Sequence, residues 1–253
     1  MRLLENHLKA VNTNWERHAT TDPLWSILTH DENKNSMWNI HKFFETGKDE
    51  ITEVISYAKK QSLPLNFGSA LDFGCGVGRL TQALADYFKE VYGVDVSPAM
   101  VNKASEYNKH NDRVSFHLNL KSDLSLFEND TFDFIYSNIT LQHMNKRLAK
   151  VYIIEMYRTL KPGGLLVFQE PTEIKSKFKI LVSIVYGIIL AWRRLVFLLI
   201  KAPYIEMHYI SQNEMKELFK KLGVITLHVR NSDAAGQWFN GLQYFITKPH
   251  LSE

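Results

Sequence analysis

The residues with the clearest chemical potential form a glycine-rich turn after a short apolar stretch. Glycines stand at positions 74, 76 and 78, and Asp72 lies two residues before the first of them. Glycine has no Cβ, so the backbone there can approach a ligand closely. A helix that begins near Arg79 would add unpaired backbone N–H groups, which attract an anion. The turn therefore predicts a site for the anionic group of a cofactor.

A second acidic residue ends the next apolar stretch. Asp95 lies 21 residues after Gly74. An acid at about this distance, at the end of a second strand, reaches ribose hydroxyls, and a carboxylate can accept hydrogen bonds from both of them. Val96 and Met100 follow, and they fit either packing on a base or packing in the core. Together, the glycine turn and Asp95 predict a nucleoside site.

His143 is the histidine with the clearest catalytic potential. Its reference pKa near neutrality suits a general base for a hydroxyl nucleophile, and a purely structural role in orienting a loop is the alternative. The other histidines show no ligand spacing and Cys75 is the single cysteine, so we predict no metal site and no disulfide. The same cysteine count favours a reducing compartment.

The elements that must position these residues alternate from residue 70 onward. Short β-rich stretches alternate with helical ones, which predicts βαβ units and a mainly parallel sheet. The expected strands are 70–73, 91–94, 114–118, 132–137, 165–169, 224–229 and 242–246. The expected helices among them are 80–88, 99–109, 146–160 and 211–222. We therefore expect a seven-stranded Rossmann-like sheet with a closing antiparallel hairpin.

Two segments fall outside this alternation. Residues 1–66 are predicted to form a helical N-terminal cap or lid, and residues 67–253 the main domain. A hydrophobic insertion is expected at 173–203, after strand five, and within it 180–192 carries no charge. Arg193 and Arg194 interrupt the apolar run, which disfavours a membrane span.

The charge of the chain is concentrated in that insertion. Between Glu173 and Lys201 six basic residues face one acidic residue, a local charge of +5, so the rest of the chain sums to −2. Basic residues that flank apolar sequence favour an anionic membrane surface or an apolar partner over nucleic acid. We expect residues 178–200 to act as a lid, as a homodimer interface or as a peripheral membrane contact. The start of the chain has no apolar run of signal-peptide length, so we predict a cytoplasmic protein, in the membrane case at the inner face.

Three stretches carry a resemblance to a known family. The acid–glycine pattern of residues 72–78, the segment Thr131–Met144 and the segment Leu160–Pro171 resemble class I S-adenosylmethionine-dependent methyltransferases of the small-molecule type. The resemblance implies a methyl donor, S-adenosylmethionine, that leaves as S-adenosylhomocysteine. It also implies transfer to an oxygen or nitrogen of a small-molecule, glycan or lipid-linked acceptor. The alternatives are an NAD-type oxidoreductase, disfavoured because Arg79 stands where a dinucleotide fingerprint has its third glycine, and a non-catalytic scaffold that binds a membrane or a partner.

The resemblance also implies the roles of individual residues. Asp72 is expected to face the ammonium group of the cofactor, and either Asn119 with Leu120 or Asp123 is expected to bond the adenine. The expected cofactor-binding residues are Asp72, Gly74, Cys75, Gly76, Gly78, Arg79, Asp95, Val96, Met100, Asn119, Leu120, Asp123, Ser137 and Asn138. The expected acceptor-site residues are Trp25, His143, Glu170 and Tyr209.

Overall fold

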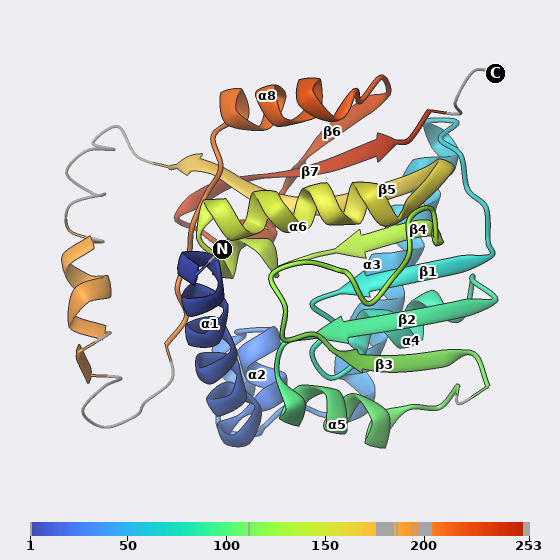
Figure 1. The fold of residues 1–253 in the computed structure, drawn as a ribbon. Helices are drawn as coiled ribbons and strands as arrows, with labels where there is room; N and C mark the ends of the chain where they lie inside the picture. Colours follow the sequence, from blue (N-terminus) through green and yellow to red (C-terminus); the bar gives the residue numbers. More distant parts are fainter. Residues whose placement is uncertain are drawn as a thin grey trace.

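A seven-stranded sheet forms the centre of the protein in the computed structural model (Figure 1). The structure describes residues 2–110, 112–175, 185, 187–193, 195–196 and 204–249. The strands are β1 (Ser69–Phe73), β2 (Glu90–Asp95), β3 (Val114–Leu118), β4 (Phe132–Ser137), β5 (Leu160–Ile174), β6 (Leu227–Ser232) and β7 (Phe239–Thr247). Their order in the sheet is β3-β2-β1-β4-β5-β7-β6.

The direction of the strands confirms the predicted fold class. Neighbours are parallel from β3 to β5, and β7 runs antiparallel to both β5 and β6. β1 pairs with β2 on one side and with β4 on the other, so the strand order reverses at β1. In open sheets of this kind, ligands bind beyond the carboxyl ends of the strands at such a switch point.

Helices cover both faces of the sheet, because alternate side chains of the central strands point to opposite faces and each face has its own apolar core. α3 (Ile40–Lys60) and α4 (Arg79–Leu84) pack on one face. α6 (Lys146–Thr159) and α8 (Gln212–Leu222) pack on the other. α5 (Pro98–Tyr107) lies beside β3 at the edge of the sheet (Figure 1).

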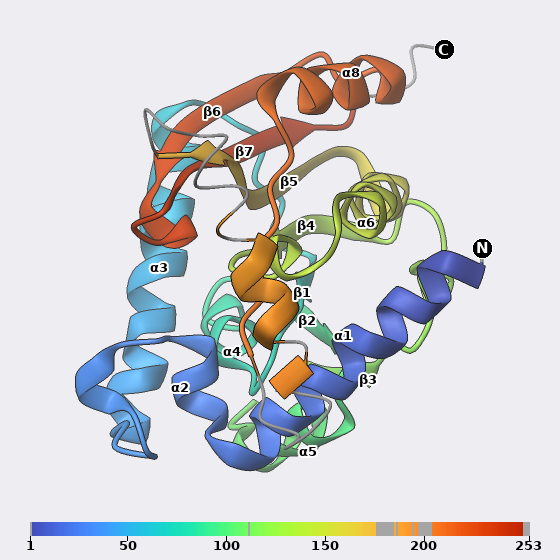
Figure 2. The same cartoon turned by 90° about the vertical axis from the view of Figure 1, so that its left-hand side faces the viewer.

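The two N-terminal helices lie across the carboxyl ends of the parallel strands (Figures 1 and 2). These are α1 (Arg2–Thr21) and α2 (Pro23–Ile27), and the side chain of Asp22 between them caps α2 by accepting from the backbone N of Trp25. α3 precedes the predicted boundary at residue 66, yet it packs into the core on one face of the sheet. The boundary itself stays a prediction. Three short 3₁₀ turns complete the description: η1 (Asp31–Asn33), η2 (Leu141–His143) and η3 (Asp233–Ala235).

Two elements differ in extent from the sequence-based expectation. β5 runs from 160 to 174 rather than 165–169, because its second half pairs with β7 far along the chain, and no local pattern reveals that partner. α4 ends at Leu84 rather than near residue 88, because the following residues form tighter i→i−3 bonds such as Tyr87 N to Leu84 O.

The predicted hydrophobic insertion at 173–203 falls mainly on residues outside the described ranges. Residues 187–193 within it are helical, and they stand beyond α1, away from the sheet (Figure 1). Within the described ranges, no helix is long and apolar enough to cross a membrane. The three roles considered for residues 178–200 stay predictions.

Candidate active site

The glycine turn between β1 and α4 is held against the end of β2. The backbone N–H groups of Gly74 and Cys75 both donate to the carbonyl of Val94, at 2.8 and 3.0 Å. Gly74 has φ +80°, and a Cβ there would lie 2.1 Å from the Thr140 side chain. At Gly76, with φ +52°, a Cβ would lie 2.7 Å from Ile27 Cδ1. Only glycine fits these two positions, so the turn is a bare-backbone cradle.

Asp95 lies directly against this cradle. One carboxylate oxygen accepts from the backbone N of Gly76 and the other from the backbone N of Ser97, each at 2.9 Å. Burial raises the pKa of Asp95, and the backbone donors oppose that shift. A carboxylate has about four lone-pair sites, so two hydroxyl donors of a ribose can still be accepted. This is the juxtaposition that the spacing of the two motifs predicts.

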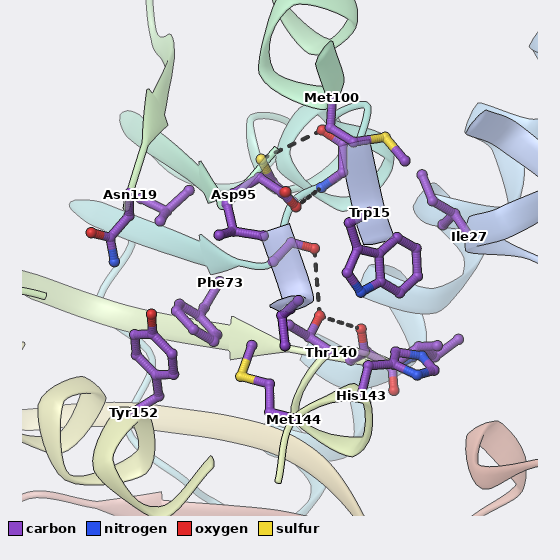
Figure 3. Close-up of a pocket in the computed structure, with 18 of the residues that line it drawn as sticks. Trp15, Ile27, Phe73, Asp95, Met100, Asn119, Thr140, His143, Met144 and Tyr152 are labelled. Carbon is purple, nitrogen blue, oxygen red and sulfur yellow. Dashed lines mark hydrogen bonds between the residues drawn. The ribbon is translucent and has the colours of Figure 1, made fainter. Parts of the chain in front are cut away.

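A pocket of about 850 Å³ of empty space, counting the part open to solvent, extends from the cradle (Figure 3). It lies beyond the carboxyl ends of β1, β2 and β4, and α1 covers it (Figure 1). Nine of the predicted cofactor-binding residues line it: Gly74, Cys75, Gly76, Arg79, Asp95, Val96, Met100, Asn119 and Asn138. From α1, the buried side chains of Leu8 and Val11 and the ring of Trp15 complete the wall.

A buried polar network holds two of these residues in place. Glu50 of α3 accepts from Arg79 at 2.8 Å through one oxygen, and from Asn138 at 2.7 Å and Tyr136 at 2.8 Å through the other. Among the described residues, Asn138 Oδ1 has no hydrogen-bond partner although it is buried in the pocket wall. A buried acceptor of this kind requires a donor. An ammonium group is a donor of this kind. Arg79 donates through its two terminal nitrogens to Glu50 and Thr46, and its Nε has no partner among the described residues.

Glu50 was missed by sequence reasoning. In the sequence it is one of several charged residues on an amphipathic helix, which indicates a solvated face. Its partners lie 29 to 88 residues away, so no local signal identifies it.

The structure separates the two candidates for the adenine edge. Asn119 lines the pocket, and its amide donates to the backbone carbonyl of Asp123 at 2.8 Å. Leu120 is exposed, and the Asp123 carboxylate accepts from the backbone N of Ser125, outside the pocket. The arrangement favours Asn119, although the adenine contact itself stays a prediction.

His143 lies at the far end of the pocket and is buried. Its Nδ1 is 2.7 Å from the backbone carbonyl of Glu206. A carbonyl can only accept, so Nδ1 carries the hydrogen and Nε2 keeps its lone pair. Burial lowers the pKa of His143 to about 4, with smaller contributions from the neighbouring His18 and His208. The imidazole is therefore neutral near pH 7 and has the tautomer of a proton acceptor.

The remaining predicted residues do not line this pocket. Asp72 is buried under the turn and accepts from the Thr81 hydroxyl at 2.6 Å, and Ser137 donates to the Phe73 carbonyl at 3.0 Å. Gly78 is the left-handed N-cap of α4. The other three lie elsewhere: the Trp25 indole donates to the His30 carbonyl, Glu170 is buried within β5, and Tyr209 is partly exposed beside Phe239. Their predicted ligand contacts stay predictions.

A second cavity adjoins the first and shares Val11, Trp15 and His143 with it. It has about 1020 Å³ of empty space, counting the part open to solvent, and it lies between α1 and residues 204–206. We call residues 204–210 the strap. The strap crosses the ends of β5 and η2: the backbone N of His208 donates to the Gln142 carbonyl at 2.7 Å, and that of Ile210 to the Pro171 carbonyl at 3.1 Å. His143 thus stands at the junction of two cavities.

Comparison with known proteins shows that the chain is similar to methyltransferases. A family model described as a methyltransferase domain matches residues 71–168. The chain is 29% identical over 171 residues to phosphoethanolamine N-methyltransferase 1 of Zea mays, covering 67% of this chain and 31% of that protein. It is 23% identical over 240 residues to the ubiquinone biosynthesis O-methyltransferase of Cereibacter sphaeroides, covering 90% of this chain and 91% of that protein. The chain spans 26–38% of the length of the first three curated relatives.

The solved structures agree on the fold. Magnesium protoporphyrin IX methyltransferase from Synechocystis, crystallised with bound S-adenosylhomocysteine, matches 92% of this chain and 98% of its own, with a TM-score of 0.58 and 15% identity. Residues 71–168 thus match a methyltransferase-domain model, and the chain shares its Rossmann-like fold with a methyltransferase crystallised with S-adenosylhomocysteine. The resemblance noted in the sequence is confirmed.

Proposed function

We propose that this chain transfers a methyl group from S-adenosylmethionine to an oxygen or nitrogen of a small-molecule acceptor, with glycan and lipid-linked acceptors included. The observation that carries the proposal is the contact of Asp95 with the Gly76 amide, at the base of a pocket that ends at His143. That pocket offers a bare backbone for the amino-acid end of the cofactor and a carboxylate for its ribose.

The residues of the chain orient the cofactor, exclude water from the site and provide a proton acceptor. S-adenosylmethionine, when bound, provides an activated methyl group. The cradle, Asp95 and Asn138 orient it, and α1 excludes water, so the main contribution is alignment of two reactants. His143 stays neutral beside a positive charge because of its burial, and its Nε2 accepts the proton of a hydroxyl acceptor.

The relatives support an oxygen acceptor more strongly than a nitrogen acceptor. A curated relative matched over nearly its whole length is named an O-methyltransferase. The phosphoethanolamine N-methyltransferases match over about a third of their length or less. A hydroxyl acceptor makes use of the base His143, whereas a neutral amine is already nucleophilic. We therefore favour an oxygen acceptor that enters through the cavity beside α1.

The insertion supports a peripheral membrane contact at an anionic surface. In the described part of 173–203, five large apolar side chains are exposed: Val185, Ile188, Ile189, Trp192 and Leu195. Unpaired apolar side chains next to a local charge of +5 fit lipid headgroups, with tryptophan at the interface. Such a contact would place the enzyme at the cytoplasmic face of a membrane, close to lipid-linked acceptors. A second copy of the chain is the competing occupant.

Calorimetric titration with S-adenosylhomocysteine tests the proposed function. The wild-type chain should bind it, and Asp95→Ala should weaken binding at least about a hundredfold, because a buried charged acceptor of two hydroxyls is lost. Asp95→Asn, which keeps one oxygen for the Gly76 amide, should weaken it less. Asp49→Ala removes an exposed carboxylate of α3 and should leave affinity unchanged.

Three outcomes would contradict the proposal. Unchanged affinity in a folded Asp95→Ala variant would place the ribose elsewhere. Binding of NAD(H) in preference to S-adenosylhomocysteine would favour the oxidoreductase alternative, and binding of neither would favour a non-catalytic scaffold.

A further inference from the structure

α1 has one apolar face and, on either side of it, two polar flanks. Residues three, four and seven apart in a helix share a face. Leu8, Val11 and Trp15 share one face and line the cofactor pocket. The polar residues flank that face on both sides, and each flank bonds a different part of the molecule.

The first flank bonds the loop that follows Asp95. The amide of Asn12 donates to the Val96 carbonyl. The Glu16 carboxylate accepts from the Ser97 hydroxyl at 2.6 Å and from the backbone N of Ala99 at 3.1 Å. This flank therefore attaches α1 to the cofactor side of the site.

The second flank bonds the strap. Asn14 makes a reciprocal pair with the backbone of Tyr204: its Nδ2 donates to the carbonyl at 2.7 Å, and its Oδ1 accepts from the amide at 3.2 Å. His18 Nε2 lies 3.4 Å from the same carbonyl. Two residues further along the strap, the Glu206 carbonyl receives the Nδ1 hydrogen of His143. The strap therefore fixes the tautomer of the base, and Asn14 fixes the strap.

From this arrangement, we propose that α1 couples cofactor binding to the orientation of His143, with Asn14 as the positioning residue. The inference rests on the proposed function. Cofactor in the pocket contacts α1 through Leu8, Val11 and Trp15, and no strap residue lines that pocket. When the cofactor holds α1 in place, the Asn14–Tyr204 pair holds the strap in place. The strap then orients His143 and closes the wall of the acceptor cavity, so both are in position only after the cofactor binds. The cofactor then binds first and the acceptor second.

Hydrogen exchange with S-adenosylhomocysteine tests the coupling without an acceptor. In the wild type, the cofactor product should slow exchange of the peptide 204–210 by about tenfold or more, because ordering α1 also holds the amides of Tyr204, His208 and Ile210. In Asn14→Ala, affinity by calorimetry should change by less than about threefold, and the slowing in 204–210 should disappear. Lys9→Ala, an exposed change on the same helix, should behave as wild type.

A spectroscopic measurement separates a specific effect of Asn14 on the orientation of His143 from a general loosening of the strap. In protein labelled with ¹⁵N-histidine, the signal assigned through His143→Asn should report the Nδ1–H tautomer in the wild-type complex. In the Asn14→Ala complex, the Nε2–H tautomer should appear alongside it, and Asn14→Asp, which keeps the acceptor for the Tyr204 amide, should lie between the two.

The outcomes distinguish this inference from the function on which it rests. If the wild type binds no S-adenosylhomocysteine, the proposed function fails and the coupling fails with it. If both proteins bind it and the strap is equally protected in Asn14→Ala with an unchanged tautomer, the function stands and the coupling through Asn14 is wrong.

Discussion

At the scale of single residues, two aspartates one strand apart have different surroundings: Asp72 is buried and Asp95 is half-buried. Asp95 accepts from two backbone amides, whereas Asp72 accepts one bond from Thr81, and its Oδ1 has no partner among the described residues. Burial raises the pKa of Asp72 to about 7, and the Thr81 hydrogen bond and the Arg79 charge oppose that shift. A carboxylate left in this state is a cost to the free protein that a bound cation would relieve.

We therefore expect Asp72→Asn to stabilise the ligand-free protein at high pH. Because the folded pKa is above the unfolded value, the folded state holds a proton that the unfolded state has lost between pH 3.8 and about 7. Stability from this group is thus present below pH 3.8 and is lost as pH rises through 7. The free energy of unfolding in urea should rise by about 1–3 kcal/mol at pH 8 and change little at pH 4. An equal change at both pH values would contradict this.

The sequence signals for the predicted cofactor-binding residues were local, and those for the proposed positioning residues were not. The closeness of Gly74 and Asp95 was predictable because Gly74 follows β1 and Asp95 ends β2, and neighbouring parallel strands end at the same edge of the sheet. Asn14 and Glu206 escaped prediction, since their partners lie 190 and 63 residues away and neither residue type is unusual for its position. Only the folded chain brings them together.

At the scale of elements, the turn after β1 combines an unusual backbone conformation with close packing. Gly74 and Gly223 both have positive φ, but a Cβ at Gly74 meets Thr140 whereas a Cβ at Gly223 meets nothing within 4 Å. Comparing the two positions therefore separates the free-energy cost of backbone strain from that of steric overlap.

Gly74→Ala should destabilise the protein more than Gly223→Ala. Gly223→Ala should cost about 1–2 kcal/mol through left-handed strain alone. Gly74→Ala adds a contact of 2.1 Å, so it should cost about 1–3 kcal/mol more and also weaken S-adenosylhomocysteine binding. Urea unfolding of both variants measures the difference. Equal losses would show that Thr140 moves aside freely.

The order of elements was predictable because strands and helices alternate with different periods. The extent of β5 and the position of β7 between β5 and β6 were not, because they depend on antiparallel pairing between segments about 70 residues apart. The hydrophobic pattern indicates which face of a strand is buried and does not identify its neighbour.

At the scale of the whole molecule, the exposed apolar side chains of Ile188, Ile189 and Trp192 lie on one helix that stands apart from the sheet. Helix 187–193 stands beyond α1, on the side where the parallel strands end (Figures 1 and 2). A contact surface there would lie close to the mouth of the site. The proposed membrane contact and the proposed acceptor entry therefore belong to the same side of the protein.

The wild-type chain should co-sediment with vesicles that contain anionic phosphatidylglycerol and much less with neutral phosphatidylcholine vesicles. Ile188→Ser should weaken that binding by about tenfold, because one large apolar contact contributes about 1.5–3 kcal/mol. Ile225→Ser removes an even more exposed isoleucine after α8 and should have no effect. Equal recovery on both vesicle types, with a dimer seen by light scattering, would instead assign this surface to a second copy.

The position of Cys75 has a practical consequence for optical work on this protein. It is the single cysteine of the chain, it is buried in the wall of the cofactor pocket, and burial raises the pKa of its thiol. A protonated, enclosed thiol reacts slowly with maleimides. Dye-attachment cysteines can therefore be introduced on α1 and on the strap while Cys75 is kept, so the distance between α1 and the strap becomes measurable by fluorescence.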